Sequence, residues 1–238
     1  MSERYIRQIP LIGEEGCSAL ERAEVFIAGA GGLGSPVSLY LAAAGVGRLR
    51  IADPDTVDES NLNRQILHPE SRLGENKAVS AKKTIEAANR DCKVTALPEK
   101  IDDTSALRLI GDAELIVDCL DNFEARYVLN RAALSLGIPL LHAAVSGYSG
   151  QLTLVIPEKT PCLSCIFPRM EDKGTSPALG AACGVVGSLQ ALEAVRIITG
   201  TPTLAGKLLL YDGAANTLSS FSVKKSPKCP VCGGQTRS

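Results

Sequence analysis

Tryptophan is absent from this sequence of 238 residues, and histidine occurs only twice, as His68 and His142. Neither histidine stands in a pattern with a partner residue, so we interpret both as structural. A large net charge is also lacking, because the formal value is −1. A nearly neutral chain lacks the strongly basic character typical of proteins that bind nucleic acid or anionic membranes. We therefore expect neither as a partner.

The sequence also shows no signal peptide. Its N-terminus, MSERYIRQIP, is charged and polar and has no apolar core. Two uncharged stretches, residues 25–47 and 174–192, are interpreted as buried elements of a soluble protein, because glycines interrupt the first and charges follow the second. We expect a cytoplasmic protein. In that reducing compartment, pairs among the eight cysteines are more often metal ligands than disulfides.

Apolar runs rich in β-formers alternate with helical patterns over the first 145 residues. Strands are predicted at 25–28, 49–52, 94–98, 115–119 and 140–144, with helices at 35–44, 77–89 and 123–136. Such alternation predicts an α/β fold, a Rossmann-like sheet with helices on both faces. Later strands at 151–156, 207–211 and 218–223 and a helix at 185–199 make the predicted sheet a mixed one.

The segment GAGGLG follows the apolar run VFIA and opens a predicted helix. Glycines here permit a tight turn and let backbone N–H groups approach a phosphate at the helix N-terminus. The candidate nucleotide-binding glycines are Gly29, Gly31, Gly32 and Gly34. Asp53 ends the next strand about 20 residues on, as a ribose-binding acid should. A glycine turn that serves only close packing is the alternative.

The loop after Asp53 reads PDTVDESNLNRQ and carries Asn61, Arg64 and Gln65. A cation flanked by amides suits a triphosphate, and Lys77 at the start of the next helix adds a second cation. An NAD-dependent oxidoreductase remains an alternative, although its dinucleotide does not require such a loop. The other alternative is that Arg64 and Lys77 are solvated surface charges.

The sequence DCLDN, from Asp118 to Asn122, ends another predicted strand. Ligands of open α/β sheets bind outside such strand ends, and a carboxylate facing a triphosphate can hold Mg²⁺. Asp121 is the candidate ligand, and Asp118 can support it from behind. Alternatively, Asp121 or Asn122 caps the helix that begins near Phe123.

Two CxxC pairs lie far apart in the chain, Cys162 with Cys165 and Cys229 with Cys232. Four thiolates in this spacing predict a tetrahedral Zn²⁺ site, which is structural because no position stays open for substrate. It would tie the C-terminal segment to the long loop at 157–184. The remaining cysteines are interpreted as buried thiols. Among them, Cys183 lies in an apolar segment just ahead of a predicted helix.

In this combination and order, the motifs resemble the HesA/MoeB/ThiF family of adenylyltransferases, relatives of the ubiquitin-activating enzymes. The resemblance covers essentially the whole chain and is carried by RYIRQ, GAGGLG, SNLNRQ, ENKA, DCLDN, both CxxC pairs, GSLQALEA and LLLYDG. It implies a single adenylation domain over residues 1–238. This domain would comprise an N-terminal arm (1–20), a nucleotide-binding half (21–145) and a partner-binding half (146–238) with the zinc site and a crossover loop.

The resemblance implies an enzyme that uses ATP and Mg²⁺ to adenylate the C-terminal glycine of a small ubiquitin-like sulfur carrier ending in Gly-Gly, of MoaD or ThiS type. The pathway stays open between molybdopterin, thiamine and other sulfur transfer. Arg7 matches an arginine that the family inserts into the neighbouring subunit's active site, which implies a homodimer. The other implied contacts are Gly32 with the nucleotide, Asp53 with ribose, Asn61, Arg64 and Lys77 with phosphates, Gln65 with the pocket, Asp121 with Mg²⁺ and Asn122 near adenine or metal.

The crossover segment MEDKGTSPALG departs from the family pattern, because no cysteine stands near Gly174 where sulfur-carrier activators often have one. Cys183 follows later in apolar surroundings without an obvious neighbouring cation, which makes a thiol a poor nucleophile. We therefore expect an acyl-adenylate without an essential thioester. A tRNA-modifying dehydratase of the same superfamily and a non-catalytic zinc-stabilised scaffold remain alternatives.

Overall fold

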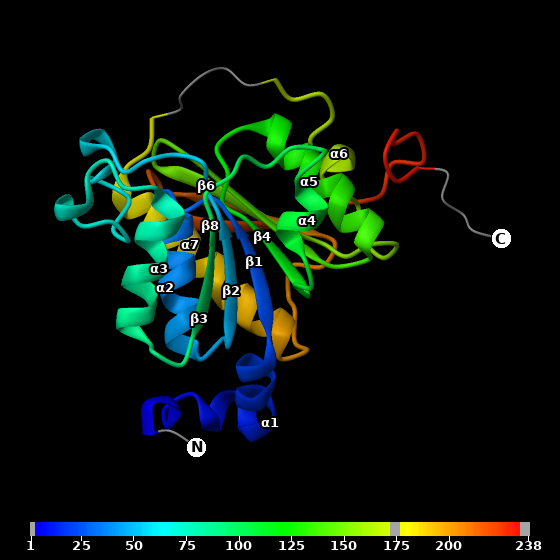
Figure 1. Ribbon diagram of the computed structural model, residues 1–238. Coiled ribbons are helices and arrows are strands. Elements are labelled where there is room, and N and C mark those ends of the chain that lie inside the picture. Colours follow the sequence, from blue (N-terminus) through cyan, green and yellow to red (C-terminus); the bar gives the residue numbers. More distant parts are fainter. Residues whose placement is uncertain (1–2, 172–176, 234–238) are drawn as a thin grey trace.

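The computed structural model describes residues 3–171 and 177–233. Within them the strands form one sheet in the order β3-β2-β1-β4-β5-β6-β7-β8 (Figure 1). The first five in this order run parallel and the remaining pairings are antiparallel. The strands are β1 (Glu24–Ala28), β2 (Arg48–Ala52), β3 (Lys93–Leu97), β4 (Leu115–Asp118), β5 (Leu140–Ser146), β6 (Ser149–Val155), β7 (Lys207–Asp212) and β8 (Thr217–Ser222).

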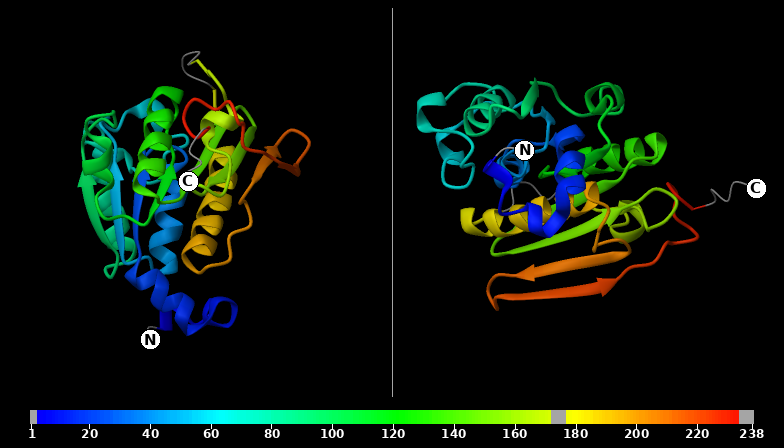
Figure 2. Two further views of the ribbon diagram at one scale, coloured as in Figure 1. Left: turned by 90° about the vertical axis from the view of Figure 1, so that its right-hand side faces the viewer. Right: turned by 90° about the horizontal axis from the view of Figure 1, so that it is seen from below.

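Helices cover both faces of the parallel part of the sheet (Figure 1). One face carries α2 (Gly34–Ala44), α3 (Lys77–Ala88) and α7 (Gly180–Ile198), and the other carries α4 (Ala106–Ile110), α5 (Phe123–Leu136) and α6 (Leu163–Ile166). Short 3-10 helices lie at Glu3–Tyr5, Glu59–Asn61 and Glu70–Arg72. The antiparallel strands β7 and β8 extend the sheet away from these helices, and β8 is exposed along its length (Figure 2).

The core consists of two apolar layers, one on each side of the sheet. On β1, Val25 and Ile27 join the layer under α2, α3 and α7, whereas Phe26 and Ala28 join the layer under α4 and α5. Because successive side chains of a strand point to opposite faces, a strand covered on both sides is apolar throughout. The predicted Rossmann-like mixed sheet with helices on both faces is therefore confirmed.

Some helices differ from the sequence prediction. The sequence did not indicate α4 and α6, which have five and four residues and are too short to show a helical period. Helix α7 begins at Gly180 instead of residue 185. Gly180, the first residue of this helix, lies against the loop after β2, because a Cβ on it would lie 2.3 Å from the carbonyl oxygen of Asn63. Cys183 is consequently in the first turn of α7, and its predicted place ahead of the helix was wrong.

Among the described residues, α7 is the helix whose length and apolar composition would suffice to cross a membrane. In the structure it lies along α2 and over β5 and β6. Its polar residues Gln190 and Glu193 are buried and hydrogen-bonded to protein groups, Gln190 to the carbonyl oxygen of Asp118 and Glu193 to the N–H of Thr203. These contacts are those of a helix that packs on a sheet.

The N-terminal segment forms a helical arm, which includes α1 (Ile9–Arg22), bent at Gly13. The arm lies against the C-terminal ends of α2 and α3 (Figure 1). The Nε2 atom of Gln8 donates to the carbonyl oxygen of Ala44 at 2.8 Å, and Arg4 donates to that of Ala88 at 3.2 Å. The arm is thus at the edge of the sheet where the parallel strands begin.

Candidate active site

The glycine segment joins the end of β1 to the start of α2. Gly29 has a φ of +96°, which side chains other than glycine rarely allow. At Gly34 a Cβ would lie 2.1 Å from the carbonyl oxygen of Gly29, so a larger residue cannot fit. The chain therefore turns tightly at the carboxyl end of the sheet. The N-terminus of α2 lies there, and a helix N-terminus is a place where anions can bind.

Beyond this turn, Gly31 and Gly32 form a cradle beside the loop that follows β2. A Cβ on Gly31 would lie 3.5 Å from Nε2 of Gln65, and one on Gly32 would lie 3.6 Å from Cγ of Arg64. The Oε1 atom of Gln65 is buried and lacks a hydrogen-bond partner in the part of the chain that the structure describes. A buried acceptor without a partner is costly, so this atom fits a site that a ligand donor completes.

Asp53 connects the cradle to the following loop. Its Oδ2 accepts a hydrogen bond from the backbone N–H of Ala30 at 2.8 Å, and its Oδ1 accepts one from that of Asp55 at 2.9 Å. Burial raises the pKa of the Asp53 carboxyl above its usual value, and these two hydrogen bonds oppose the rise. Each carboxylate oxygen has a further lone pair, so Asp53 can still accept a ribose hydroxyl.

Two cations lie near this edge of the sheet. Arg64 is half-buried, and its Nη1 donates to the carbonyl oxygen of Ser60 at 2.8 Å. Lys77 is buried, and its Nζ lies 3.1 Å from Oδ2 of Asp55. A lysine at the first position of a helix opposes the helix dipole, and burying it adds a desolvation cost. The alternative that Lys77 is a solvated surface charge is therefore wrong.

The DCLDN loop follows β4 at the same edge, next to β1. Asn122 caps α5, since its Oδ1 accepts from the backbone N–H of Ala125 at 2.9 Å. Asp121 is exposed and receives a hydrogen bond at 3.3 Å from the side chain of Asn122. Capping thus falls to Asn122, and the carboxylate of Asp121 faces solvent. The register pairs Ala28 of β1 with Asp118 of β4, so the glycine turn and this loop leave neighbouring strands side by side.

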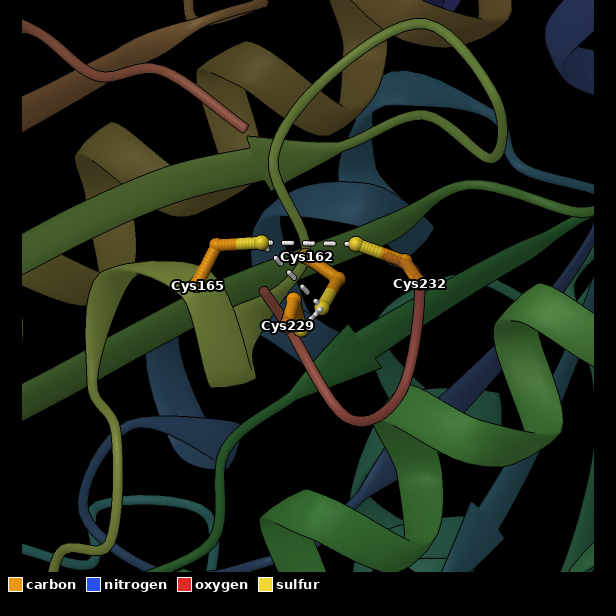
Figure 3. Close-up of side chains that lie close together, drawn as sticks. All are labelled: Cys162, Cys165, Cys229 and Cys232. Carbon is orange, nitrogen blue, oxygen red and sulfur yellow. Dashed lines mark hydrogen bonds between the residues drawn. The ribbon is translucent and has the colours of Figure 1, made fainter. Parts of the chain in front are cut away.

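The four paired cysteines converge on the opposite side of the sheet from α7 (Figure 3). Their sulfur atoms all lie within 4.8 Å of one another. The Sγ atoms of Cys162 and Cys229 are 3.6 Å apart, and those of Cys165 and Cys232 are 3.3 Å apart. A tetrahedral ion with Zn–S bonds of about 2.3 Å needs sulfurs about 3.8 Å apart. The cluster therefore fits a four-coordinate metal.

Comparison with known proteins decides the family. The ThiF family matches residues 4–231, nearly the whole chain. This chain belongs to the ThiF family. The sulfur carrier protein adenylyltransferase of Thermus thermophilus is 40% identical over 247 residues, covering 98% of this chain and 91% of that protein. The SAMP-activating enzyme E1 of Haloferax volcanii is 38% identical over 240 residues, covering 97% and 88%.

Solved structures show the same fold. A crystal structure of E. coli MccB matches with a TM-score of 0.88 at 24% identity, covering 97% of this chain and 74% of that one. The predictions of a ThiF-type family and of an adenylyltransferase are therefore confirmed. The names of the relatives favour this activity over a tRNA-modifying dehydratase, an NAD-dependent oxidoreductase or a non-catalytic scaffold.

Arg7 is a predicted site residue that the fold places away from the glycine cradle. Its neighbour Gln8 is bonded to the C-terminal end of α2, whereas the site lies at the N-terminal end. A helix of 11 residues spans about 16 Å. The arginine is exposed on an arm at the far edge of the sheet. Within one chain it is therefore remote from the glycine cradle.

Cys183 lies against the cradle, because a Cβ on Gly32 would be 3.0 Å from its sulfur. Burial raises the pKa of the Cys183 thiol, and the charge of Arg64 opposes that rise. The expectation of no neighbouring cation was wrong, since the loop after β2 folds back over the start of α7. The Cys183 thiol is still expected to be a poor nucleophile, because it is buried and burial disfavours the thiolate. The position near Gly174 lies outside the described residues.

The contacts of Asp118 with other buried polar side chains were not predicted from the sequence. His142 hydrogen-bonds to Asp118 deep in the sheet, Arg126 lies beside both, and Gln190 of α7 donates to the carbonyl oxygens of Asp118 and Leu141. A histidine on the strand that follows the DCLDN strand was the available signal. Assigning it requires the register of β4 and β5, which pairs Asp118 with His142.

Proposed function

We propose that this ThiF-family chain uses ATP to adenylate the C-terminal glycine carboxylate of a small ubiquitin-like sulfur-carrier protein ending in Gly-Gly. The names of its relatives, which refer to a sulfur carrier protein and to SAMP activation, support that substrate. The observation that carries the proposal is the arrangement at one edge of the sheet. A glycine cradle, a buried lysine and an exposed carboxylate lie there, on the segments that follow β1, β2 and β4.

The proposed roles follow from position. The N–H groups of the glycine turn bind phosphate oxygens, Asp53 accepts a ribose hydroxyl, and Gln65 closes the pocket. Arg64 and Lys77 neutralise phosphate charge. Asp121 would hold Mg²⁺, an ion that prefers carboxylate oxygens and substrate phosphates and supplies charge neutralisation. The nucleotide-contacting set is Gly29, Gly31, Gly32, Gly34, Asp53, Asn61, Arg64, Gln65, Lys77, Asp121 and Asn122.

The chemistry is an in-line displacement at phosphorus. A carboxylate resists attack on its carbon because its charge is delocalised. An oxygen of the carrier's terminal carboxylate attacks the α-phosphorus of ATP, the bond to the bridging oxygen breaks, and pyrophosphate leaves with its electron pair. The enzyme positions the reactants and stabilises the charge that builds up on the phosphates. The product is an acyl-adenylate, and this step needs no protein nucleophile.

The direct test is exchange of labelled pyrophosphate into ATP by the purified enzyme. We expect exchange to require Mg²⁺ and a carrier ending in Gly-Gly. A carrier that lacks its last glycine should support none, because its carboxylate cannot reach the α-phosphorus. The Cys183→Ser enzyme should retain exchange and should still support thiocarboxylate formation with an external sulfide source. Exchange that is independent of any carrier would refute the substrate assignment.

We further propose that the cysteine cluster holds one structural Zn²⁺. Thiolates are the ligands that zinc prefers in structural sites, and four of them leave no position for substrate. The ion would join α6 and the segment before it to the C-terminal segment at Cys229 and Cys232. It would thereby stabilise the partner-binding half, residues 146–238. We propose that this half, the arm at 1–20 and the nucleotide-binding half at 21–145 form a single domain of residues 1–238.

Metal analysis is expected to find one zinc per chain, and removal by a strong chelator should lower the melting temperature. Because the binding free energy of a structural metal contributes to folding, we expect a loss of at least about 5 °C. Cys232→Ser should remove the zinc. Cys92→Ser is the matched control, because this thiol is buried outside the cluster and should leave one zinc per chain. A metal content unchanged in Cys232→Ser would contradict the ligand set.

A homodimer is part of the same proposal. Ile6 and Leu11 flank Arg7 on the arm and are 66% and 84% exposed. Exposed apolar side chains also line a groove on α7, where Val185 and Leu192 are 40% and 49% exposed. Large apolar side chains left in contact with solvent mark an interface, and we assign it to a second copy because Arg7 is remote from its own site.

We place this enzyme in the cytoplasm, and cell fractionation tests that location.

A further inference from the structure

A buried carboxylate that takes no part in the proposed chemistry lies directly before the loop that contains Asp121. Asp118, the last residue of β4, is fully buried. Its Oδ2 accepts a hydrogen bond from Nδ1 of His142 at 2.6 Å, and the Nε atom of Arg126 lies 3.6 Å from the same oxygen. A carboxylate in such a place is costly unless it is fully hydrogen-bonded. His142, also fully buried, supplies the shortest of these contacts.

The hydrogen bonds define the state of His142. Its Nε2 faces the side-chain nitrogen of Gln151 at 3.4 Å. An amide nitrogen only donates, so Nε2 is the acceptor and the proton resides on Nδ1. Burial lowers the pKa of His142, against the opposing effect of Asp118. A neutral imidazole therefore donates its Nδ1–H to the carboxylate of Asp118.

Asp118 and Arg126 together hold the backbone of Leu120, the residue before Asp121. The N–H of Leu120 donates to Oδ1 of Asp118 at 3.0 Å, and the carbonyl oxygen of Leu120 accepts from Nη2 of Arg126 at 2.5 Å. Both peptide groups of Leu120 are thus held by one ion pair. The next residue is Asp121, and the one after it caps α5. Asp121, the candidate metal ligand, therefore lies between two residues whose positions are fixed by hydrogen bonds, Leu120 and Asn122.

The imidazole ring is itself held in place. The ring of Phe167 lies 5.5 Å from that of His142 and 6.2 Å from that of Phe123, the first residue of α5. The carbonyl oxygen of Phe167 accepts from the hydroxyl of Tyr127 at 2.5 Å. An imidazole packed in this way can direct its Nδ1–H in one direction only. Such support is what a side chain needs to position another group accurately.

We propose that His142 is a positioning residue for the adenylation site, acting through Asp118 and Leu120 to hold the carboxylate of Asp121 where it binds Mg²⁺. This rests on the proposed function, because it takes Asp121 as the metal ligand. Without the Nδ1–H donor, Oδ2 of Asp118 retains Arg126 as its neighbour, and the Nε of Arg126 has no hydrogen-bond partner among the described residues. The carboxylate turns to that nitrogen, the guanidinium leaves Leu120, and the loop loosens.

Two substitutions of His142 separate positioning from packing. In His142→Asn the amide nitrogen takes the place of Nδ1 and can still donate to Asp118. In His142→Gln the amide nitrogen takes the place of Nε2, and the donor to Asp118 is lost. Asparagine is smaller and leaves the larger cavity, so packing alone would make it the worse variant. Positioning through Nδ1 makes glutamine the worse one.

The measurement is binding of a non-hydrolysable ATP analogue by calorimetry at rising Mg²⁺ concentration, with unfolding followed in parallel. We expect His142→Gln to raise the Mg²⁺ concentration for half-maximal binding about tenfold, the effect of one lost hydrogen bond to a charged group. His142→Asn should stay within about threefold of wild type, although it is the less stable protein. Thr153→Val is the control. Thr153 of β6 pairs with His142 and is equally buried, but its hydroxyl donates to the carbonyl oxygen of Lys207 on β7.

The variant Asp121→Asn distinguishes a failure of the His142 inference from a failure of the proposed metal site. If Asp121→Asn leaves the Mg²⁺ dependence unchanged, the metal site itself is wrong and the inference falls with it. If Asp121→Asn shifts that dependence but the Asn and Gln variants of His142 behave alike, the inference alone is overturned. Should His142→Gln fail to fold, Arg126→Lys takes its place, because lysine keeps the charge beside Asp118 but loses the guanidinium contact with Leu120. An unchanged Mg²⁺ dependence in Arg126→Lys would also overturn it.

Discussion

Asp121→Ala is expected to lower carrier-dependent ATP–pyrophosphate exchange by at least about 10²-fold while the protein stays folded. The large effect follows from the loss of the carboxylate that would hold Mg²⁺ against the triphosphate, where charge must be neutralised as pyrophosphate leaves. The fold should survive because Asp121 is exposed and the capping of α5 depends on Asn122. Exchange assays and thermal unfolding of the same preparation give both answers.

Asp112→Ala is the matched control for this variant. Asp112 is also an exposed aspartate, but it precedes the amino end of β4, whereas Asp121 follows the carboxyl end. Removing either one changes the net charge equally, so a general electrostatic effect would appear in both. We expect Asp112→Ala to retain exchange within about twofold of wild type. Near-normal exchange in Asp121→Ala, with Mg²⁺ present, would remove Asp121 from the site.

The sequence was sufficient to predict those features of the site that depend on local order along the chain. Strand, glycine turn and helix follow one another from Val25 to Ala44, and the steric need for glycine at Gly34 is visible in the motif itself. The two CxxC pairs could be matched because tetrahedral coordination by four thiolates depends on residue type and spacing. Their convergence in space agrees with that prediction.

Other features depended on contacts that spacing does not encode. The start of α7 was predicted five residues too late, and its first residue, Gly180, packs against the distant loop after β2, where a Cβ would lie 2.3 Å from the carbonyl oxygen of Asn63. The hydrogen bond between His142 and Asp118 depends on the register of β4 and β5. The cation beside Cys183 comes from a loop more than 100 residues earlier in the chain. Each of these is a tertiary contact between distant segments.

The resemblance carried by RYIRQ implied that Arg7 enters the active site of a neighbouring subunit. The structure places the arm against the C-terminal ends of α2 and α3, through Gln8 and Arg4, while the glycine cradle lies at the N-terminal end of α2. An arginine on that arm can serve an adenylation site only if the site belongs to another subunit. The position of the arm therefore supports the proposal that Arg7 serves the site of a second subunit.

Arg7→Ala is expected to reduce exchange by about 10³-fold, the usual effect of an arginine that enters a phosphoryl-transfer site from a partner. A dimer assembled from one Arg7→Ala chain and one Asp121→Ala chain should recover about half of the wild-type activity. In that mixed dimer one site keeps its own Asp121 and receives Arg7 from the partner, whereas the other site lacks both. Two different affinity tags allow the mixed dimer to be purified before the exchange assay.

The reverse pairing gives the opposite result and completes the test. A dimer of one wild-type chain and one chain with both Arg7→Ala and Asp121→Ala should be as inactive as either single variant, because each of its sites lacks one residue. If Arg7 served its own chain, this second dimer would show about half activity and the first would show none. The two mixed dimers contain the same side chains overall, so composition and net charge are equal. A difference between them can arise only from which subunit supplies the arginine.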